Sequence, residues 1–197
     1  MIQNAGKEKG DGHPRPGDRI EESFLKHRRI FVWGAIDDPI SEKTVKKLLY
    51  LDAESPKDPI TMYINSPGGA MTSGFAIYDT MLGVSAPVHT VCLGLAASFG
   101  AVLLAAGVKG HRSAWPHARI LIHQPLIPGQ VIGSASDLEI QAQEMLRMRE
   151  WINQILSDLS GRDLEKIRSD TDRDFYMGAE EAKEYGLIDT ILGPEPS

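Results

Sequence analysis

Cysteine is almost absent from this sequence, because Cys92 is the single cysteine in 197 residues. One thiol cannot form a disulfide within the chain, and low cysteine usage is typical of proteins from a reducing compartment. A cysteine-rich zinc site is also excluded, and the sequence has no H-E-x-x-H motif. We therefore expect no metal site.

Positive charge is also scarce. The chain has 21 Lys and Arg against 27 Asp and Glu, which gives a formal net charge of −6. Proteins that bind nucleic acid present a basic face to the phosphates, and no basic stripe is visible here. We therefore expect no nucleic-acid partner.

Long apolar segments are few. Residues 88–107 carry no formal charge over 20 residues, a length that could span a bilayer. The segment contains His89, Thr90 and Ser98 and divides into a β-like and a helix-like half, so we interpret it as a buried strand and helix. The N-terminus lacks the apolar region of a secretory signal. The sequence thus predicts no membrane association and a cytoplasmic location.

The remaining composition is that of an ordinary soluble protein, with 42% hydrophobic and 24% charged residues. Residues 1–18 are rich in Gly, Pro, Lys and Asp and predict a flexible N-terminal arm, and residues 19–197 are expected to form a single domain. Strand-like and helix-like patterns alternate along this domain and predict an α/β fold. Strands are expected over residues 29–34, 60–65, 88–93, 118–123 and 189–192. Helices are expected after an N-cap at Ser41 and over residues 71–83, 101–106, 137–160, 163–170 and 179–185.

The longest expected helix, over residues 137–160, is apolar over a wide arc. Ser136 and Glu139 predict a capping box at its start. Trp151 and Ile155 lie beside the main apolar stripe, which is more than one core-facing surface requires. We interpret the extra surface as a subunit interface, with a fully buried helix as the alternative.

Ser98 stands between small residues where an apolar strand turns into a helix. Such a corner can expose a nucleophilic hydroxyl above the unpaired N–H groups of a helix start, but an isolated serine there is commonly only an N-cap. A second corner, Gly68-Gly69, exposes backbone N–H groups that could bind an oxyanion, or is a plain glycine turn.

A nucleophilic serine needs a base and an acid that orients the base. Of the six histidines, His123 ends an apolar strand at its carboxyl end, where ligands bind in α/β sheets. Residues 170–174 contain several aspartates, which could equally cap helices or form surface ion pairs. The spacing does not show which aspartate reaches His123, so a Ser/His/Asp hydrolase is a hypothesis at this point.

Four motifs together resemble the proteolytic subunits of the Clp protease family, in both order and spacing. They are Tyr63-Ile64-Asn65-Ser66-Pro67-Gly68-Gly69, Gly94-Leu95-Ala96-Ala97-Ser98-Phe99-Gly100, Ile122-His123-Gln124-Pro125-Leu126 and Asp170-Thr171-Asp172-Arg173-Asp174. The resemblance implies a crotonase-like α/β fold of repeated β-α units with a protruding handle helix. It also implies a serine endopeptidase that degrades unfolded proteins to short peptides inside a closed chamber.

The resemblance further implies roles for individual residues. The catalytic residues would be Ser98, His123 and Asp174. The backbone N–H groups of Gly69 and Phe99 would form the oxyanion hole, without a metal or organic cofactor. The substrate would bind as an added strand between two segments that contain Gly68, Ala70, Met71, Pro125 and Leu126. Contacts between rings would come from Asp172, Arg173, Trp151 and Ile155.

The implied partners are further copies of this chain in two stacked heptameric rings, or a paralogue in mixed rings, together with an AAA+ unfoldase of the ClpX, ClpA or ClpC type. Thr61 and Gly83 replace aromatic residues that receive the unfoldase in many family members, although Tyr63 keeps one aromatic wall. We therefore expect weak docking by a homomeric ring unless Met62 or Leu82 refills the pocket. The alternative functions are a weakly active structural ring subunit and a crotonase-like acyl-CoA enzyme that uses the oxyanion hole without the triad.

Overall fold

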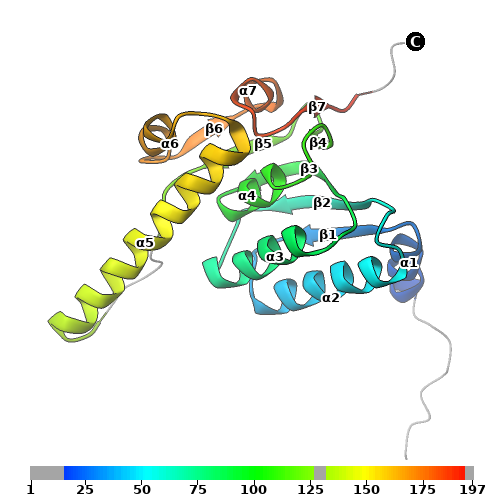
Figure 1. Ribbon diagram of the computed structural model, residues 1–197, viewed down its shortest axis with the longest axis horizontal. Coiled ribbons are helices and arrows are strands. Elements are labelled where there is room, and N and C mark those ends of the chain that lie inside the picture. Colours follow the sequence, from blue (N-terminus) through cyan, green and yellow to red (C-terminus); the bar gives the residue numbers. More distant parts are fainter. Residues whose placement is uncertain (1–15, 127–131, 194–197) are drawn as a thin grey trace, which may run out of the picture.

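The computed structural model describes residues 16–126 and 132–193 (Figure 1). Strands and helices alternate through most of the chain, which confirms the predicted α/β class. In chain order the elements are α1 (Pro16–Lys26), β1 (Arg29–Trp33), α2 (Asp38–Glu54), β2 (Ile60–Ser66), α3 (Met71–Gly83), β3 (Val88–Ala97), α4 (Phe99–Ala105), β4 (Arg112–Ala114), β5 (Arg119–Ile122), α5 (Ala135–Ser160), α6 (Leu164–Asp170), β6 (Phe175–Met177), α7 (Ala179–Tyr185) and β7 (Thr190–Ile191).

The main sheet is parallel, with the strand order β1-β2-β3-β4-β7. Parallel neighbours need a crossover connection, and α2, α3 and α4 supply the first three. These helices pack against one another in the same order. Along β2, the side chains of Ile60, Met62 and Ile64 are buried, whereas those of Thr61 and Tyr63 are half-buried on the opposite face. The helices and the buried side chains form one hydrophobic core.

Strand β3 belongs to two parts of the sheet. Its first half pairs with β4, and its residues from Leu95 to Ala97 pair with β5, which in turn pairs antiparallel with β6. Gly94 lies between the halves with φ of +84°, a conformation that a residue with a Cβ adopts only with strain. The side chain of Asn65 bridges the irregularity, since its Oδ1 accepts the Leu95 N–H at 3.2 Å. The strand therefore continues past the predicted end at residue 93 and carries the chain to Ser98.

The start of α2 differs from the prediction, which placed its N-cap at Ser41. The N-cap is Asp37, whose carboxylate accepts the Ile40 N–H at 3.0 Å. Ser41 is buried one turn inside the helix and donates its hydroxyl to the Ser73 carbonyl at 2.8 Å. The aspartate is the better cap because its side chain reaches the unpaired N–H groups of the first turn.

The start of α5 also differs from the prediction. The capping box is formed by Ser134 and Asp137, not by Ser136 and Glu139. Both pairs have the required spacing, and the chain uses the earlier one, which lengthens the helix to Ala135–Ser160. The predicted helix end at Gly161 is confirmed, with that residue in the left-handed conformation.

Three elements are missing from the sequence-based prediction. Strands β4 and β6 have 3 residues each, too few for a periodic pattern to appear. Helix α1 begins at Pro16 and so overlaps the end of the arm predicted for residues 1–18, whose first 15 residues lie outside the described part. Its Phe24 packs edge-on against Phe31 of β1 at a centroid distance of 4.8 Å.

Helix α5 divides into a packed and a projecting half (Figure 1). Ile152 and Leu156 near its C-terminal end are buried in the core. Leu138, Ile140 and Leu146 in the other half are exposed, because that half extends away from the body of this chain. No described helix, within residues 16–126 and 132–193, is long and apolar enough to cross a membrane.

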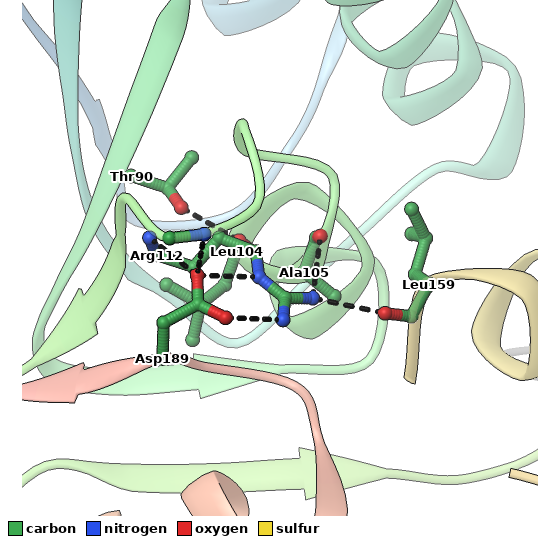
Figure 2. Close-up of polar contacts among 7 residues, drawn as sticks. Thr90, Leu104, Ala105, Arg112, Leu159 and Asp189 are labelled. Carbon is green, nitrogen blue, oxygen red and sulfur yellow. Dashed lines mark hydrogen bonds and ion pairs between the residues drawn. The ribbon is translucent and has the colours of Figure 1, made fainter. Parts of the chain in front are cut away.

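A buried ion pair fixes the packed end of α5 to the sheet (Figure 2). Arg112 of β4 donates Nη2 to Asp189 Oδ1 at 2.7 Å and Nε to Asp189 Oδ2 at 2.9 Å. Its Nη1 donates to the carbonyls of Ala105, at the end of α4, and Leu159, in the last turn of α5. One guanidinium thus joins β4, α4 and α5 to the carboxylate of the residue just before β7.

Candidate active site

Ser98 occupies a strained corner between β3 and α4. Its φ of 54° and ψ of −124° are outside the ordinary regions for a residue with a Cβ. Its N–H donates to the Leu121 carbonyl at 2.8 Å, and its carbonyl accepts from the first turn of α4. The side chain makes no capping hydrogen bond to the helix. The interpretation of Ser98 as a side-chain N-cap is therefore wrong, and the hydroxyl is left for another role.

The Gly68-Gly69 corner lies against Ser98. A Cβ added to Gly68 would stand 2.7 Å from the Ser98 Cβ, and one added to Gly69 would stand 2.1 Å from the Ile36 carbonyl oxygen. Only residues without side chains allow this contact. Ile36 holds the corner as a short parallel bridge, since its N–H donates to the Gly68 carbonyl and its carbonyl accepts the Ala70 N–H, each at 2.8 Å.

Two backbone N–H groups at these corners have no hydrogen-bond acceptor among the described residues. They belong to Gly69, in the loop, and to Phe99, the first residue of α4. An unpaired N–H at a strand-to-helix corner is suited to a developing oxyanion. The side chain of Phe99 is buried, packed against Gly74 and edge-on to Phe75 at 5.0 Å, so only its backbone can act at the surface.

His123 and Asp174 are brought together by the pairing of β5 with β6. The antiparallel register places Ile122 opposite Phe175, so the residues just beyond this pair, His123 and Asp174, are also neighbours. His123 Nδ1 lies 2.9 Å from Asp174 Oδ1, a hydrogen bond that the ring N–H donates to the carboxylate. Asp172 points elsewhere, with its carboxylate 3.9 Å from both Arg149 and Arg173. Asp174 is therefore the aspartate that reaches His123.

Ser98 and His123 line the same narrow recess. Its apolar walls come from α3, α4, β5, the segment after β5, and the packed half of α5. Within the described residues, no hydrogen bond joins the Ser98 hydroxyl to the His123 ring. The lining residues are Met71, Ser98, Phe99, Val102, Ile122, His123, Pro125, Ile152 and Leu156.

The residues predicted to bind substrate flank this recess. Met71 and Pro125 line it directly, and Gly68 and Ala70 belong to the corner held by Ile36. Leu126 is exposed and lines a neighbouring depression that also contains His123 and Asp174. The sequence did not single out Ile36, and its only signal is its position just after the first strand.

The residues predicted to contact other subunits are accessible in this chain. Trp151 is 49% exposed and packs edge-on against Phe75 at 6.0 Å. Together with Ile155 it lines an open groove between α3 and α5. Arg173 is exposed in the loop before Asp174. The recess and the groove thus lie on the two sides of the packed half of α5.

At the face predicted to receive an unfoldase, Tyr63 supplies an aromatic ring that stacks on Phe31 at 5.2 Å, whereas Thr61 and Gly83 supply none. Thr61 lines a depression with the stacked rings of His89 and His111, whose centroids are 4.0 Å apart. Burial and the neighbouring His111 lower the pKa of His89. Met62 is fully buried in the core and does not refill this depression. A Cβ at Gly83 would meet nothing within 4 Å, so that position has room for a larger side chain.

Comparison of the sequence with known proteins agrees with the family resemblance carried by the four motifs. A family model described as Clp protease matches residues 15–195. The chain is 56% identical over 165 residues to the "ATP-dependent Clp protease proteolytic subunit 3" of Synechococcus sp. (strain CC9605), covering 84% of this chain and 82% of that protein. It is 54% identical over 165 residues to the protein of the same name from Parasynechococcus marenigrum (strain WH8102), with the same coverage. With the motifs, the α/β fold and the site geometry, these matches establish that this chain belongs to the Clp protease family.

Proposed function

We propose that this chain is a serine endopeptidase subunit that hydrolyses unfolded proteins through Ser98, His123 and Asp174. One observation carries the proposal: a strained serine and a histidine bonded to a carboxylate line the same recess, beside two unpaired N–H groups. Membership of the Clp protease family gives the reaction class, because the relatives are named proteolytic subunits. The chemistry follows from these groups alone.

In the proposed reaction His123 takes the proton from Ser98 Oγ as that oxygen attacks the peptide carbonyl. This step requires a hydrogen bond between Ser98 Oγ and the His123 ring, and catalytic contacts of this kind often tighten only with substrate bound. The C–N bond breaks as the leaving amine receives the proton from His123. Water then attacks the acyl-enzyme by the same route, releasing the acid and restoring the Ser98 hydroxyl.

Asp174 and the backbone have supporting roles in this mechanism. The Asp174 carboxylate accepts a hydrogen bond from the Nδ1–H of His123, which leaves Nε2 free to act as the base and stabilises the imidazolium that forms. The N–H groups of Gly69 and Phe99 would stabilise the oxyanion of the tetrahedral intermediate. Donors of this kind typically contribute about 3 to 4 kcal/mol each to transition-state binding.

The substrate would lie as an extended strand between the corner at Gly68, Ala70 and Met71 and the segment at Pro125 and Leu126. Support comes from the position of these residues beside the recess. Main-chain hydrogen bonds give such a strand affinity with little dependence on sequence, which suits a peptidase for unfolded chains.

Labelling with a fluorophosphonate tests the nucleophile. The assembled protein should become labelled at Ser98, as read by peptide mass spectrometry, and Ser98→Ala should lose both the label and the hydrolysis of a short fluorogenic peptide. We expect the loss of turnover to be about 10⁴-fold to 10⁶-fold. Undiminished hydrolysis by Ser98→Ala would contradict the proposal, whereas an unlabelled, inactive wild type that still assembles would favour a structural ring subunit.

For the assembly, we propose two stacked heptameric rings, built from this chain alone or with a paralogue, in the cytoplasm. Trp151 and Ile155 would bury the groove beside α5 against another subunit, and Asp172 and Arg173 would meet the opposite ring. Trp151→Glu should give smaller particles in native mass spectrometry, because an unpaired charge at an interface costs several kcal/mol. The exposed Tyr50→Glu on α2 is the control, and equal masses for wild type and Trp151→Glu would refute the interface.

For the energy-dependent partner, we propose an AAA+ unfoldase of the ClpX, ClpA or ClpC type that binds a homomeric ring weakly. The polar depression at Thr61 and the open position at Gly83 support this, because an aromatic side chain offers 150–250 Å² of contact that these residues lack. The double variant Thr61→Tyr with Gly83→Phe should bind surface-immobilised unfoldase more tightly. Tight binding by the unmodified homomeric ring would rule out the weak-docking proposal.

A further inference from the structure

The loop that carries Asp174 is held by more than the bond to His123. The Asp174 side chain is 58% exposed and, among the described residues, makes a single hydrogen bond, to the His123 ring, which by itself would leave it free to change rotamer. Gln124, the residue after His123, fixes the loop from the β5 side. Its backbone N–H donates to the Thr171 carbonyl at 2.6 Å, and its Nε2 donates to the Asp172 carbonyl at 2.7 Å. The histidine and its carboxylate thus sit on segments that are directly bonded to each other.

Helix α5 reaches the same loop from the other side. The Thr171 hydroxyl is 2.9 Å from Oδ1 of Asn153 and 2.8 Å from the Ile167 carbonyl. A hydroxyl has one proton and cannot donate to both acceptors at once. If it donates to Ile167, the oxygens of Thr171 and Asn153 face each other at 2.9 Å, which is repulsive. With Oδ1 of Asn153 toward Thr171, the hydroxyl can therefore bond either Asn153 or Ile167, but not both.

Two buried nitrogens beside this contact have no hydrogen-bond partner among the described residues. They are Nδ2 of Asn153, whose side chain is only 1% exposed, and Nε of Arg149. The residues are four apart on α5, so their side chains are neighbours on one face of the helix. A buried donor without an acceptor is unfavourable, because it has lost its hydrogen bond to water without replacing it.

Turning the Asn153 amide by 180° resolves the conflict at Thr171. Nδ2 then donates to the Thr171 hydroxyl, which donates its own proton to the Ile167 carbonyl. The result is a hydrogen-bonded link from α5, through Asn153 and Thr171, to the start of the loop that ends at Asp174.

We propose that Asn153, Thr171 and Gln124 are positioning residues that clamp the Asp174 loop between α5 and β5, and so hold the carboxylate against His123. This inference rests on the proposed function for its effect on turnover, but not for its effect on the loop. The clamp also makes the position of α5 relative to the loop a determinant of activity, because one helix carries both Asn153 and the surface at Trp151. Each clamp residue acts through the loop and none contacts the reacting atoms.

The test compares Thr171→Val, which keeps the shape and removes the hydroxyl, with Thr171→Ser, which keeps the hydroxyl. The matched control is Thr44→Val in α2, since Thr44 is also a buried threonine that donates to the carbonyl four residues earlier, at 2.8 Å. Deuterium uptake over residues 171–176 and the kcat and KM for a short peptide are measured on assembled protein. Wild type and Ser98→Ala are measured alongside.

We expect Thr171→Val to raise deuterium uptake in the loop and to lower kcat about 10-fold to 100-fold with KM within about twofold, because a small misplacement of a catalytic group has effects of this size. Thr171→Ser should restore both, and Thr44→Val should change neither. Wild-type uptake in Thr171→Val, or raised uptake with wild-type kcat, overturns the proposal. A wild type that does not cleave peptide refutes the proposed function, and uptake still decides whether the clamp exists.

If Thr171→Val does not assemble, Gln124→Met tests the other side of the clamp, because Gln124 is only half-buried and the substitution keeps its length. The same rise in loop uptake and fall in kcat are expected. Wild-type uptake in an assembled Gln124→Met protein would overturn the proposal.

Discussion

Asp189 binds the side chain of Arg112 and Asp174 binds that of His123, but the two carboxylates differ in exposure and in the number of hydrogen bonds they accept. Asp189 is 18% exposed, and it receives two hydrogen bonds from the Arg112 side chain and two from the N–H groups of Gly110 and Arg112 (Figure 2). Asp174 is 58% exposed and, within the part of the chain that the structure describes, receives one hydrogen bond, from His123. The first carboxylate is saturated with donors, and the second keeps lone pairs open to solvent.

The difference reflects what each pair must do. Arg112 and Asp189 remain charged throughout, and together they fix β4, α4 and α5 to one another, so their geometry should not change. The Arg112 guanidinium lowers the pKa of Asp189 to about 2. In the proposed mechanism His123 gains and loses a proton in every turnover, and a ring enclosed by many fixed bonds could not do so. The comparison therefore separates a pair that supports stability from a pair that supports chemistry.

The largest expected effect is on turnover and comes from the exposed pair, His123 and Asp174. Asp174→Asn should lower kcat by about 10⁴-fold, because an amide in place of the carboxylate favours the wrong tautomer of His123 and does not stabilise its protonated form. The free energy of unfolding should change by less than about 0.5 kcal/mol, since the side chain is exposed. Peptide hydrolysis and urea unfolding are the two measurements. Asp58→Asn, an exposed carboxylate on the turn before β2, is the control for both.

Substitution in the buried pair, Arg112 and Asp189, should lower stability and leave turnover nearly unchanged. Asp189→Asn leaves the buried Arg112 charge without a counter-ion, which typically costs about 3 to 5 kcal/mol of stability. Urea denaturation should show this loss, whereas kcat per assembled particle should stay within about threefold of wild type. A loss of stability under about 1 kcal/mol, or a loss of activity as large as that of Asp174→Asn, would contradict the distinction between the pairs.

The pair of Arg112 and Asp189 should also make the free energy of unfolding depend on pH in acid, which is a smaller effect. The folded pKa of Asp189, about 2, is below its ordinary value of about 4, so the stabilisation is complete above pH 4 and is lost as the pH falls toward 2. A shift of this size corresponds to on the order of 2 to 3 kcal/mol. Glu21, with its pKa lowered to about 2 by Lys43 and Lys47, adds to the total in the wild type.

The contribution of Asp189 is isolated by comparing wild type with Asp189→Asn. Urea denaturation between pH 4.5 and pH 2.5 should show a steeper loss of stability for the wild type, so that the two curves converge in acid. Parallel curves over this range would mean that the ion pair does not titrate with unfolding.

Particular residues show how far sequence reasoning reached. The corner at Ser98 could be predicted because a run of apolar residues, a break at small residues and a second apolar run have a local cause. Cap positions were less secure, as at Ser41 and Ser136, because several polar residues near a helix start satisfy the same rule and packing selects one. Strands β4 and β6 could not be predicted, since three residues acquire strand structure only from the neighbours with which they pair.

By itself, the sequence determined the α/β class, most of the long elements, the serine corner and a short set of candidate bases and acids. Hydrophobic periodicity and turn residues depend only on nearby positions in the chain, so they can be recognised without knowledge of the fold. Residue spacing left the aspartate open and the family resemblance indicated Asp174. Only the tertiary structure shows that Asp174, and not Asp172, bonds His123, because the register of β5 against β6 joins segments 51 residues apart. The clamp of Asn153, Thr171 and Gln124 is likewise a product of packing: three separate segments meet there, and no spacing along the chain records that they do.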